Sequence, residues 1–383
     1  MQEAVMEKKE KLCAVVIGAG WAGEGHTIAL REAGVEVVAM CGRSPEPTQR
    51  RAAQLNIPEV RFDWYKALME FKPNIVAIAT PGNVHYEIAL AAAKMGIHIL
   101  CDKPLGIDAI EARSMLHAVE QAGVKHAYAS TSQYGPLFQY ARQLLADGKI
   151  GQMWHAEYID HWSIPISPLN WGHQLSLGGG VLNNLFTHHL GQVLRVTRGK
   201  VHAVTGKVTR SGGLVPVGKP VHDFRELFKN EIKADEMIGS KEVDADYAYT
   251  ALVEIGMPDG NSAVVLFQNS AQSVGNFASY AAFYGSKGTL RINSEEPKRI
   301  MLATTEHPEW KEMPVPQTII DRLPAVSDHV QRDWNQLCRE FIGDIRGQGY
   351  AGYPTFHDGW IAHEVIDGIR SGKGWVMIPD NPL

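Results

Sequence analysis

Short, continuous apolar runs alternate with amphipathic stretches along the first third of the chain. A continuous apolar run is typical of a strand buried on both faces, and apolar residues at helical spacing indicate a helix that covers it. This alternation predicts a parallel sheet with helices on both faces. The expected strands are 12–17, 36–41, 60–62, 75–79, 98–101 and 124–130; the expected helices are 24–33, 64–71, 83–95 and 108–121, with a further helix that opens at Ser44-Pro45.

The pattern changes in the second part of the chain. A predicted helix at 136–147 leads into a long strand at 153–162, and another helix follows the glycines 178–180 and ends near Thr197. After it, strands follow one another without helices between them, which predicts a mostly antiparallel open sheet. These strands are expected at 201–210, 247–255, 262–270, 278–284 and 288–293.

Two further stretches complete the pattern. Residues 211–246 are too polar and too numerous for a simple hairpin connection, so we expect an excursion near the functional site or at an interface. The chain ends with amphipathic segments at 326–345 and 356–371, which are predicted helices.

The first predicted strand runs directly into glycines spaced G-x-G-x-x-G. Gly18 permits a tight turn, Gly20 lets the backbone approach a diphosphate, and Gly23 lets the next helix pack close to the strand. The strand before and the helix after distinguish this motif from an ordinary glycine turn. The phosphates of a dinucleotide would lie on amide groups at the helix N-terminus, where the helix dipole favours negative charge. Cofactor contacts are therefore expected from Gly18, Gly20, Trp21, Ala22 and Gly23.

The end of the second strand bears on the choice of dinucleotide. A site for NAD usually has an acidic residue there, about 20 residues after the glycines, to accept from the ribose 2′-hydroxyl. This chain has Gly42, Arg43 and Ser44 instead. An arginine fork and a serine hydroxyl suit a 2′-phosphate, which favours NADP(H). NAD(H) stays possible if Arg43 only covers the adenine.

Composition narrows the class of protein. The 383 residues carry a net charge of -5, and no apolar run approaches the length of a membrane span, so neither a nucleic-acid nor a membrane partner is expected. The charged first residues lack the apolar core of a signal peptide and predict a loose arm. The four cysteines (Cys13, Cys41, Cys101 and Cys338) are far apart, which indicates a reducing, cytoplasmic setting without disulfides. The histidines are scattered, so no metal site is expected.

Several motifs together resemble one family of oxidoreductases. They are Ala77-Ile78-Ala79-Thr80-Pro81-Gly82-Asn83-Val84-His85, then His98-Ile99-Leu100-Cys101-Asp102-Lys103-Pro104-Leu105, then Gly178-Gly179-Gly180 leading into Asn184 and His188, and finally Gly285-Ser286-Lys287-Gly288-Thr289-Leu290. Over nearly the whole chain they resemble the glucose–fructose oxidoreductase / inositol dehydrogenase / MocA (Gfo/Idh/MocA) family. The resemblance implies NAD(P)-dependent dehydrogenases or reductases of sugars, polyols and related diols. It also implies a homodimer or homotetramer that associates through the C-terminal sheet.

The resemblance and the pattern of elements together predict an α/β fold with an N-terminal Rossmann doubly wound parallel sheet. A C-terminal α+β domain with a large, mostly antiparallel open sheet would follow. The expected parts are a flexible arm at 1–10, an NAD(P)-binding Rossmann domain at 11–132, and a substrate-binding and oligomerisation domain at 133–383.

The resemblance implies three catalytic residues. Lys103 matches the lysine that hydrogen-bonds the reacting hydroxyl, where an ammonium stabilises developing negative charge. His188 matches the acid/base histidine, a residue type suited to proton removal near neutral pH. Asn184 stands where relatives commonly have aspartate, and its spacing from His188 puts both on one helix face. The alternatives are a solvated loop lysine and a packing histidine; His189 points elsewhere on the helix and is the weaker candidate.

Further site residues are expected around these. Cofactor contacts are expected from Thr80, Pro81, Asn83, His85, Asp102 and Lys103; substrate contacts are expected from Lys103, Gln133, Tyr158, Trp162, Trp171, His173, Asn184 and His188. Asp102 replaces the usual glutamate, and Asn83 can instead be a helix cap. Tyr158 can instead belong to the core. Gln133 stands where many relatives have arginine, which weakens the case for a strongly anionic substrate.

These observations predict an NAD(P)-dependent oxidoreductase. It would transfer a hydride between the nicotinamide and a hydroxyl or ketone of a sugar, glycoside, polyol or cyclic diol. Two alternatives stay open: a redox-neutral enzyme that retains NAD through an oxidation, elimination and reduction, and a non-catalytic cofactor-binding regulator.

Overall fold

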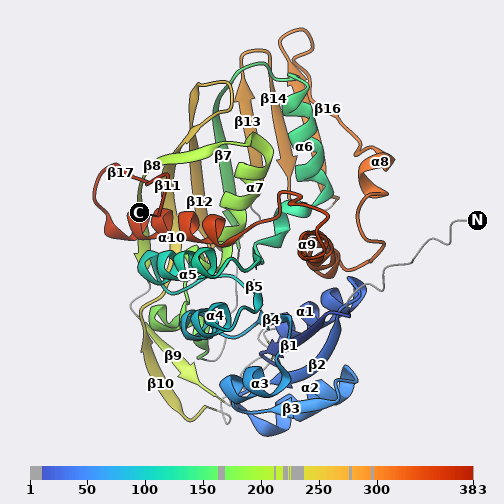
Figure 1. Ribbon diagram of the computed structural model, residues 1–383. Helices are drawn as coiled ribbons and strands as arrows, with labels where there is room; N and C mark the ends of the chain where they lie inside the picture. Colours follow the sequence, from blue (N-terminus) through green and yellow to red (C-terminus); the bar gives the residue numbers. More distant parts are fainter. Residues whose placement is uncertain are drawn as a thin grey trace, which may run out of the picture.

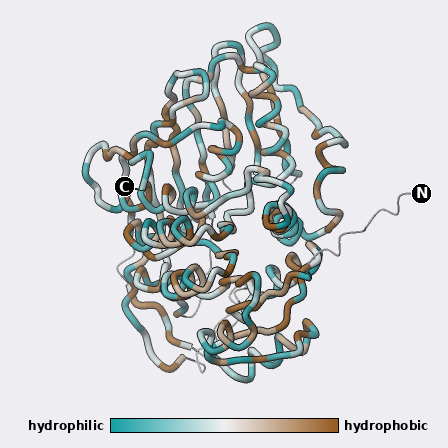
Figure 2. The backbone as a smooth tube through the Cα atoms, viewed as in Figure 1, coloured by the Kyte–Doolittle hydropathy of each residue, from teal (hydrophilic) through white to brown (hydrophobic). Residues whose placement is uncertain are grey.

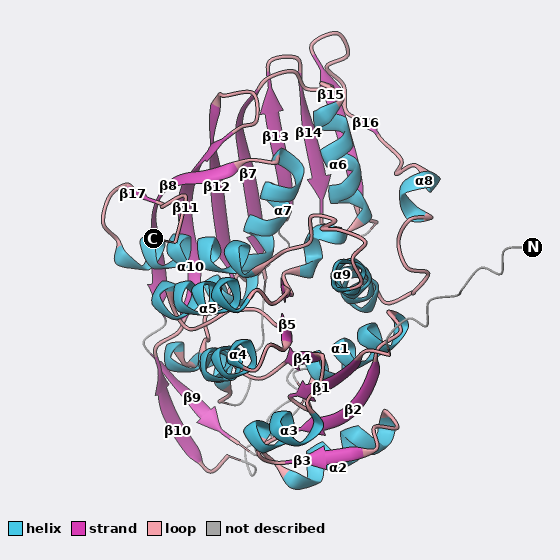
Figure 3. Cartoon of the chain, in the orientation of Figure 1, coloured by secondary structure: helices cyan, strands magenta, loops and turns pink. Residues whose placement is uncertain are grey.

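Two sheets organise the chain, as the computed structural model shows (Figures 1 and 3). The structure describes residues 11–162, 169–210, 213–218, 223, 225, 237–275, 278–294 and 297–382. The arm predicted for residues 1–10 lies outside these residues. No helix in these ranges has both the length and the apolar content needed to cross a bilayer.

The first sheet is parallel, six-stranded and ordered β3-β2-β1-β4-β5-β6. Its strands are β1 (Cys13–Ile17), β2 (Glu36–Cys41), β3 (Glu59–Arg61), β4 (Ile75–Ile78), β5 (His98–Cys101) and β6 (His126–Tyr128), and its helices are α1 (Trp21–Glu32), α2 (Pro45–Gln54), α3 (Trp64–Phe71), α4 (His85–Lys94) and α5 (Ala109–Ala122). The strand order reverses between β1 and β4. In such sheets ligands bind outside the carboxyl ends of the strands at this switch point.

Local sequence signals explain where several helices begin. Asp63 and Asp108 cap α3 and α5, because their carboxylates accept from the backbone N–H groups of Lys66 and Glu111. The predicted helix at 83–95 is divided: a 3₁₀ turn, η1 (Gly82–Val84), precedes α4, and Asn83 makes no cap for it. Helix α1 begins earlier than predicted because the glycine turn is short, and Gly20 is its N-cap.

The second sheet has nine strands in the order β16-β15-β14-β13-β7-β12-β11-β8-β17. They are β7 (Met153–His161), β8 (Lys200–Arg210), β11 (Asp246–Gly256), β12 (Ser262–Ser270), β13 (Tyr280–Gly285), β14 (Gly288–Asn293), β15 (Arg299–Thr304), β16 (Lys311–Glu312) and β17 (Val376–Met377). Strands β7 and β12 are parallel neighbours, and every other neighbouring pair is antiparallel. The predicted fold class is confirmed.

Helices cover one face of the large sheet (Figures 1 and 3). They are α6 (Pro136–Ala146), α7 (Thr187–Thr197) and α10 (Phe356–Ser371). Leu144, Val193 and Ile366 from these helices join Phe267 and Phe283 of the sheet in one buried core. Burial of such apolar side chains is the main source of stability in this half.

The end of the chain returns to the parallel sheet. Helix α9 (His329–Ile345) packs on α1, where a Cβ at Gly25 would lie 2.2 Å from the Trp334 ring. Phe356 and Trp360 of α10 are fully buried with residues of β4, β5 and α5. Figure 2 shows both hydrophobic and hydrophilic residues in α9, as expected of a helix with one buried face. The terminal helices therefore complete the core of the first sheet, while the domain boundary at 132 stays a prediction.

The polar stretch 211–246 is described only in part. It contributes β9 (Gly213–Val217) and β10 (Gly239–Val243), which form a two-stranded antiparallel ribbon. Asp223 and Arg225 contact α1 and α2, and the remainder of the predicted excursion lies outside the described residues. The described part thus reaches the first sheet from the second half of the chain.

Candidate active site

The turn after β1 leaves no room for side chains. Gly18 has φ 122°, and a Cβ there would lie 2.2 Å from the carbonyl oxygen of Ala79. A Cβ at Gly23 would lie 1.9 Å from the carbonyl oxygen of Gly18. The N-cap of α1 is Gly20, which has no side chain to bond the first amide groups of the helix. This geometry fits a diphosphate that rests on backbone amides.

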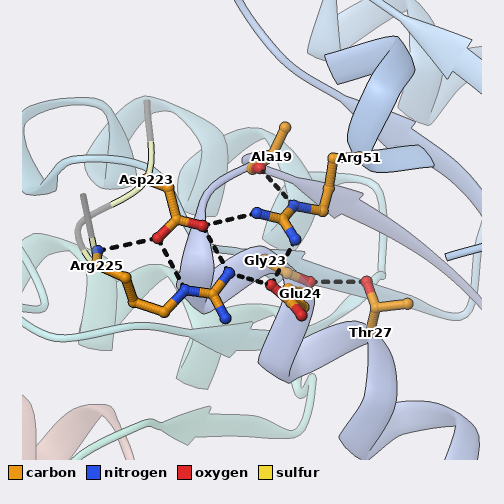
Figure 4. Close-up of polar contacts among 7 residues, drawn as sticks. All are labelled: Ala19, Gly23, Glu24, Thr27, Arg51, Asp223 and Arg225. Carbon is orange, nitrogen blue, oxygen red and sulfur yellow. Dashed lines mark hydrogen bonds and ion pairs between the residues drawn. The ribbon is translucent and has the colours of Figure 1, made fainter. Parts of the chain in front are cut away.

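Charged side chains brace this turn from outside (Figure 4). Nε of Arg51 donates to the carbonyl oxygen of Ala19 over 3.3 Å, and the same guanidinium pairs with Glu24 and with Asp223 at 2.5 and 2.7 Å. Arg225 pairs with both carboxylates as well. The turn is therefore held by α2 and by the second half of the chain, and nothing in the sequence identified these residues.

The end of β2 offers hydroxyl and guanidinium groups. A Cβ at Gly42 would lie 2.2 Å from Oγ1 of Thr48, and that hydroxyl donates to the carbonyl oxygen of Ser44. Arg43 is exposed beside it. Residues 42–45 contain no carboxylate that could accept from a ribose hydroxyl.

Strand β5 delivers Lys103 to the carboxyl edge of the parallel sheet. The Lys103-Pro104 peptide is cis, and the ammonium donates to Oδ1 of Asn184 over 3.2 Å. Burial lowers the pKa of Lys103, while the carboxylate of Asp102 opposes that shift. Residues 81 positions apart in the sequence thus meet at one point.

Asn184 and His188 come from the helical segment that follows the three glycines. Its first turn, η5 (Leu182–Phe186), is a π-helix, a form often found at functional sites. Nδ2 of Asn184 donates to the carbonyl oxygen of Gly180, which leaves Oδ1 for Lys103. Burial, and then the charges of Lys103 and His189, hold the pKa of His188 well below its usual range. Its Nδ1 is buried with no hydrogen-bond partner among the described residues.

Both ring nitrogens of the neighbouring His189 have polar partners. Its Nδ1 lies 3.0 Å from the Tyr249 hydroxyl, its Nε2 lies 3.0 Å from Oδ2 of Asp160, and its ring stacks on Tyr158 at 4.2 Å. The hydroxyl of Tyr158 donates to Gln192. This buried network leaves His188 as the histidine beside Lys103.

The predicted cofactor residues after β4 and β5 lie close together but differ in exposure. Pro81 precedes η1, which contains Asn83. His85 is fully buried, with its ring nitrogens on the carbonyl oxygens of Thr80 and Pro104. Asp102 is also buried and accepts from the backbone N–H of Lys103 over 2.6 Å. Direct cofactor contacts from these residues stay predictions.

The glycine triplet comes up against the same loops. A Cβ at Gly178 would lie 3.2 Å from Cα of Gly82 and 3.3 Å from Cγ of Pro104. A Cβ at these distances would require the neighbouring atoms to shift by a few tenths of an ångström, and the φ of Gly178, 83°, is one that L residues rarely adopt. The two halves of the chain therefore meet beside Lys103.

The predicted substrate residues are less uniform in position. Gln133 and Tyr158 are buried, and Gln133 donates to the carbonyl oxygen of Ser130. Trp162 is 51% exposed and donates to Asp160. Trp171 and His173 form the short turn η3 (Trp171–His173), which packs on Gly179. A role for these side chains in substrate binding stays a prediction.

A hollow of about 510 Å³ lies at the opposite edge of the parallel sheet. It is lined by residues before β1, β4 and β5, such as Leu12, Asn74 and Ile97. Ligands of such sheets bind at the carboxyl edge, so this hollow is separate from the candidate site.

Comparison with known proteins decides the family. Residues 12–130 match the model of an oxidoreductase family with an NAD-binding Rossmann fold, Gfo/Idh/MocA, and residues 138–291 match a C-terminal domain model of the same family. The chain belongs to the Gfo/Idh/MocA family. The resemblance drawn from the sequence motifs is thereby confirmed, and with it the nicotinamide dinucleotide as the class of cofactor.

Individual members of the Gfo/Idh/MocA family match different shares of the chain. Levoglucosan dehydrogenase of Pseudarthrobacter phenanthrenivorans is 31% identical over 45% of this chain and 48% of its own length. An uncharacterised oxidoreductase of Synechocystis sp. is 28% identical over 98% of both chains. The chain thus spans about half the length of the first of these relatives.

Solved structures agree in fold. The structure of a levoglucosan dehydrogenase in complex with NADH and L-sorbose has a TM-score of 0.80 at 22% identity and covers 96% of this chain and 99% of its own. At this identity the likeness concerns the fold. It supports the two-sheet architecture of this Gfo/Idh/MocA member.

Proposed function

We propose that the chain is an NAD(P)-dependent dehydrogenase that acts on a neutral sugar, glycoside, polyol or cyclic diol. The observation that carries the proposal is the contact between Lys103 and Asn184, with the neutral His188 beside them. An ammonium and an imidazole next to each other suit the removal of a hydroxyl proton. Their place at the carboxyl end of β5, at the same edge of the parallel sheet as the glycine turn, suits a dinucleotide enzyme.

The residues present fit the cofactor. The backbone around Gly18, Gly20 and Gly23, with Trp21 and Ala22, would hold the diphosphate on the N-terminus of α1. The residues after β4 and β5 would face the nicotinamide ribose. Arg43 and Ser44 support NADP(H), because no carboxylate stands there to repel a 2′-phosphate. NAD(H) is the second possibility, with Arg43 over the adenine.

The chain's own side chains would act on the proton and the oxygen of the reacting hydroxyl. The cofactor, when bound, supplies a hydride acceptor for the carbinol carbon in oxidation, or a hydride donor in reduction. His188 takes the proton of the reacting hydroxyl, and Lys103 stabilises the negative charge that develops on the oxygen. Asn184 holds the ammonium in place through Oδ1.

The substrate class draws on relatives and on the charge of the site. Relatives named inositol 2-dehydrogenase/D-chiro-inositol 3-dehydrogenase and D-glucoside 3-dehydrogenase match 36% and 42% of this chain. Gln133 is neutral where many relatives have arginine, which supports an uncharged substrate. The half-exposed Trp162 offers an aromatic face on which the C–H side of a sugar ring can stack.

The test is a panel of sugars, glycosides, anhydrosugars, inositols and cyclic diols, each assayed by nicotinamide absorbance with NAD and NADP in parallel. With the best substrate, Lys103→Met and His188→Ala are expected to lose at least about two orders of magnitude in kcat. Near wild-type turnover of both variants would contradict the assignments. Stoichiometric cofactor after gel filtration would favour the redox-neutral alternative, and cofactor binding without any turnover would favour a regulator.

We also propose a homodimer or homotetramer in a cytoplasmic setting. The face of the large sheet opposite the helices carries Leu252 and Val264, each 37% exposed, and a partner copy would cover them. The four cysteines are free, which suits a reducing compartment. Light scattering coupled to gel filtration measures the number of copies, and a monomer at all concentrations would contradict the proposal.

A further inference from the structure

Three buried histidines converge on the loop that carries Lys103. His26 comes from α1, His85 from α4 and His363 from α10, and each is 0% exposed. The loop is the segment 102–106 after β5. No catalytic role explains His26 or His363, and a cofactor contact does not explain why His85 is completely covered.

His85 connects two loops at the carboxyl edge of the sheet. Its Nδ1 lies 2.8 Å from the carbonyl oxygen of Pro104, and its Nε2 lies 2.8 Å from that of Thr80. Thr80 lies in the segment after β4, and Pro104 directly follows Lys103. One ring therefore lies between the two segments that flank the predicted nicotinamide site, and in its neutral form it donates to one of the two carbonyl oxygens and packs against the other.

His26 lies against the carboxylate that begins the loop. Its Nε2 is 3.4 Å from Oδ2 of Asp102, and its ring meets the edge of Trp334 in α9. The other oxygen of Asp102 accepts from the backbone N–H of Lys103 over 2.6 Å. The helix that follows the glycine turn is thus in contact, through one carboxylate, with the backbone of the lysine.

His363 holds the far end of the loop. Its Nε2 accepts from the backbone N–H of Gly106 over 3.2 Å. Beside it, Leu105 packs against α10 so closely that a Cβ at Gly359 would lie 2.8 Å from its side chain. Helix α10 belongs to the last part of the chain, so the loop is hydrogen-bonded from α4 and α10 and packed from α1 by His26, whose ring nitrogens make no hydrogen bond within the described residues.

We propose that His26, His85 and His363 form a histidine cradle that positions Lys103 for the reaction, with His85 as its central member. The inference rests on the proposed function for the role of Lys103. A lysine side chain is long and flexible, so its ammonium can be placed accurately only if its backbone is fixed. Misplacement of a reacting group by about 1 Å can cost about a hundredfold in rate.

The chemistry of imidazole suits this place. A neutral ring offers one donor and one acceptor, so His85 donates to one of its two carbonyl neighbours, and Nε2 of His363 accepts from Gly106, without adding a charge. Burial lowers the pKa of all three histidines, to about 3 for His363. Because these rings are uncharged at neutral pH, they do not repel the ammonium of Lys103. Lysine or arginine side chains at these positions would repel it.

The experiment compares His85→Ala, His85→Gln and His363→Ala with wild type in the holoenzyme. We expect His85→Ala to lose about a hundredfold in kcat, with a smaller change in the KM for cofactor. Glutamine retains a side-chain donor for a carbonyl, so kcat of His85→Gln should be at least tenfold higher than kcat of His85→Ala. His363→Ala should lower kcat in the same direction, since Gly106 loses its acceptor.

A matched control is His126→Ala. His126 also meets α10, since its Nδ1 accepts from the backbone N–H of Phe356, but it stands at the amino end of β6, away from Lys103. Its loss should lower stability and leave kcat within twofold. Equal losses of kcat in His126→Ala and His85→Ala would overturn the cradle, because any buried histidine would then have the same effect.

A second readout is independent of substrate. Amide hydrogen exchange of the peptide that spans 102–106 should be at least tenfold faster in His85→Ala, while the β1 peptide is unchanged. If His85→Ala does not fold, the same measurement on His85→Gln and His363→Ala decides. Unchanged exchange and kcat in folded variants would refute the cradle. Faster exchange in His85→Ala, together with a wild type that turns over no substrate of the panel, would leave the cradle standing and refute the dehydrogenase.

Discussion

Lys103 donates its ammonium hydrogen bond to the amide oxygen of Asn184, a neutral acceptor, over 3.2 Å. The contact joins the loop after β5 to the π-turn that precedes α7, and so it connects the two halves of the molecule. Because the acceptor carries no charge, it adds no full negative charge to offset the burial that lowers the pKa of Lys103. Asn184 likewise adds no negative charge near His188, whose pKa is lowered by burial and by the positive charge of Lys103.

The first prediction concerns Asn184→Asp. A carboxylate within about 4–6 Å favours the charged form of a base and shifts its pKa by about 1–3 units. The acid limb of the kcat/KM profile for alcohol oxidation, which reports the base, should therefore move to higher pH by about one unit or more. The measurement is kcat/KM against pH for both proteins. A limb that stays in place in a folded variant would show that His188 is not the base.

A second prediction tests the glycine turn. In Gly18→Ala a Cβ must be placed 2.2 Å from the carbonyl oxygen of Ala79, at a φ of 122° that L residues rarely adopt. The turn has to move, so we expect cofactor affinity to fall by at least about a hundredfold and unfolding free energy by about 1–3 kcal/mol. Cofactor titration by nicotinamide fluorescence measures the first, and urea unfolding the second.

Gly96→Ala is the matched control for this variant. Gly96 also has a positive φ, 73°, but a Cβ there would have nothing within 4 Å, and the residue lies at the other edge of the sheet. It should lose only about 1–2 kcal/mol from backbone strain and retain cofactor affinity. Equal losses of affinity in the two variants would mean that strain, and not the blocked turn, is responsible.

Much of this architecture is predictable from the chain because local signals agree with the tertiary structure. The apolar runs of β1, β2, β4 and β5 are largely buried, and Asp63 and Asp108 cap α3 and α5. The three residues Lys103, Asn184 and His188 could be named because each lies in a recognisable motif. Their meeting across the two halves depends on the close approach of Gly178 to Gly82 and Pro104, which strand order alone does not determine.

Other features had no local signal. Nothing about Trp334 or Trp360 indicates that the final helices pack on the first sheet, since an amphipathic helix does not specify its partner. The parallel neighbours β7 and β12 are separated by a long stretch of chain, and periodicity cannot identify such pairs. His26 and His363 are ordinary helix residues in the sequence, and only the fold brings them to the loop of Lys103.

The third prediction concerns stability against pH. Burial lowers the pKa of His26, His85 and His188, and it lowers those of His126 and His363 to about 4 and about 3. Below the ordinary imidazole pKa of about 6.5 the unfolded chain binds protons that the native state does not, so stability falls as pH falls. We expect the free energy of unfolding, measured in urea, to be at least about 2 kcal/mol lower at pH 5 than at pH 7.5.

Asp333 acts in the opposite direction and provides the control. Burial raises its pKa to about 7, so its native carboxyl is protonated where the unfolded one is not, and it adds stability as pH falls through 7. Asp333→Asn removes this contribution and should make the acid loss steeper. A shallower loss in the variant, or a wild type equally stable at both pH values, would contradict the assigned directions.

The last prediction decides the cofactor. Arg43 is exposed at the end of β2, and a charge-assisted hydrogen bond to a 2′-phosphate contributes about 1.5–3 kcal/mol. Arg43→Ala should therefore lower kcat/KM for NADP by at least about tenfold and leave the value for NAD within twofold. Arg50→Ala is the control, because Arg50 is also exposed on α2 and pairs only loosely with Glu46, at 3.8 Å. Equal losses with both cofactors in Arg43→Ala would place the guanidinium over the adenine and would remove its support for NADP(H) over NAD(H).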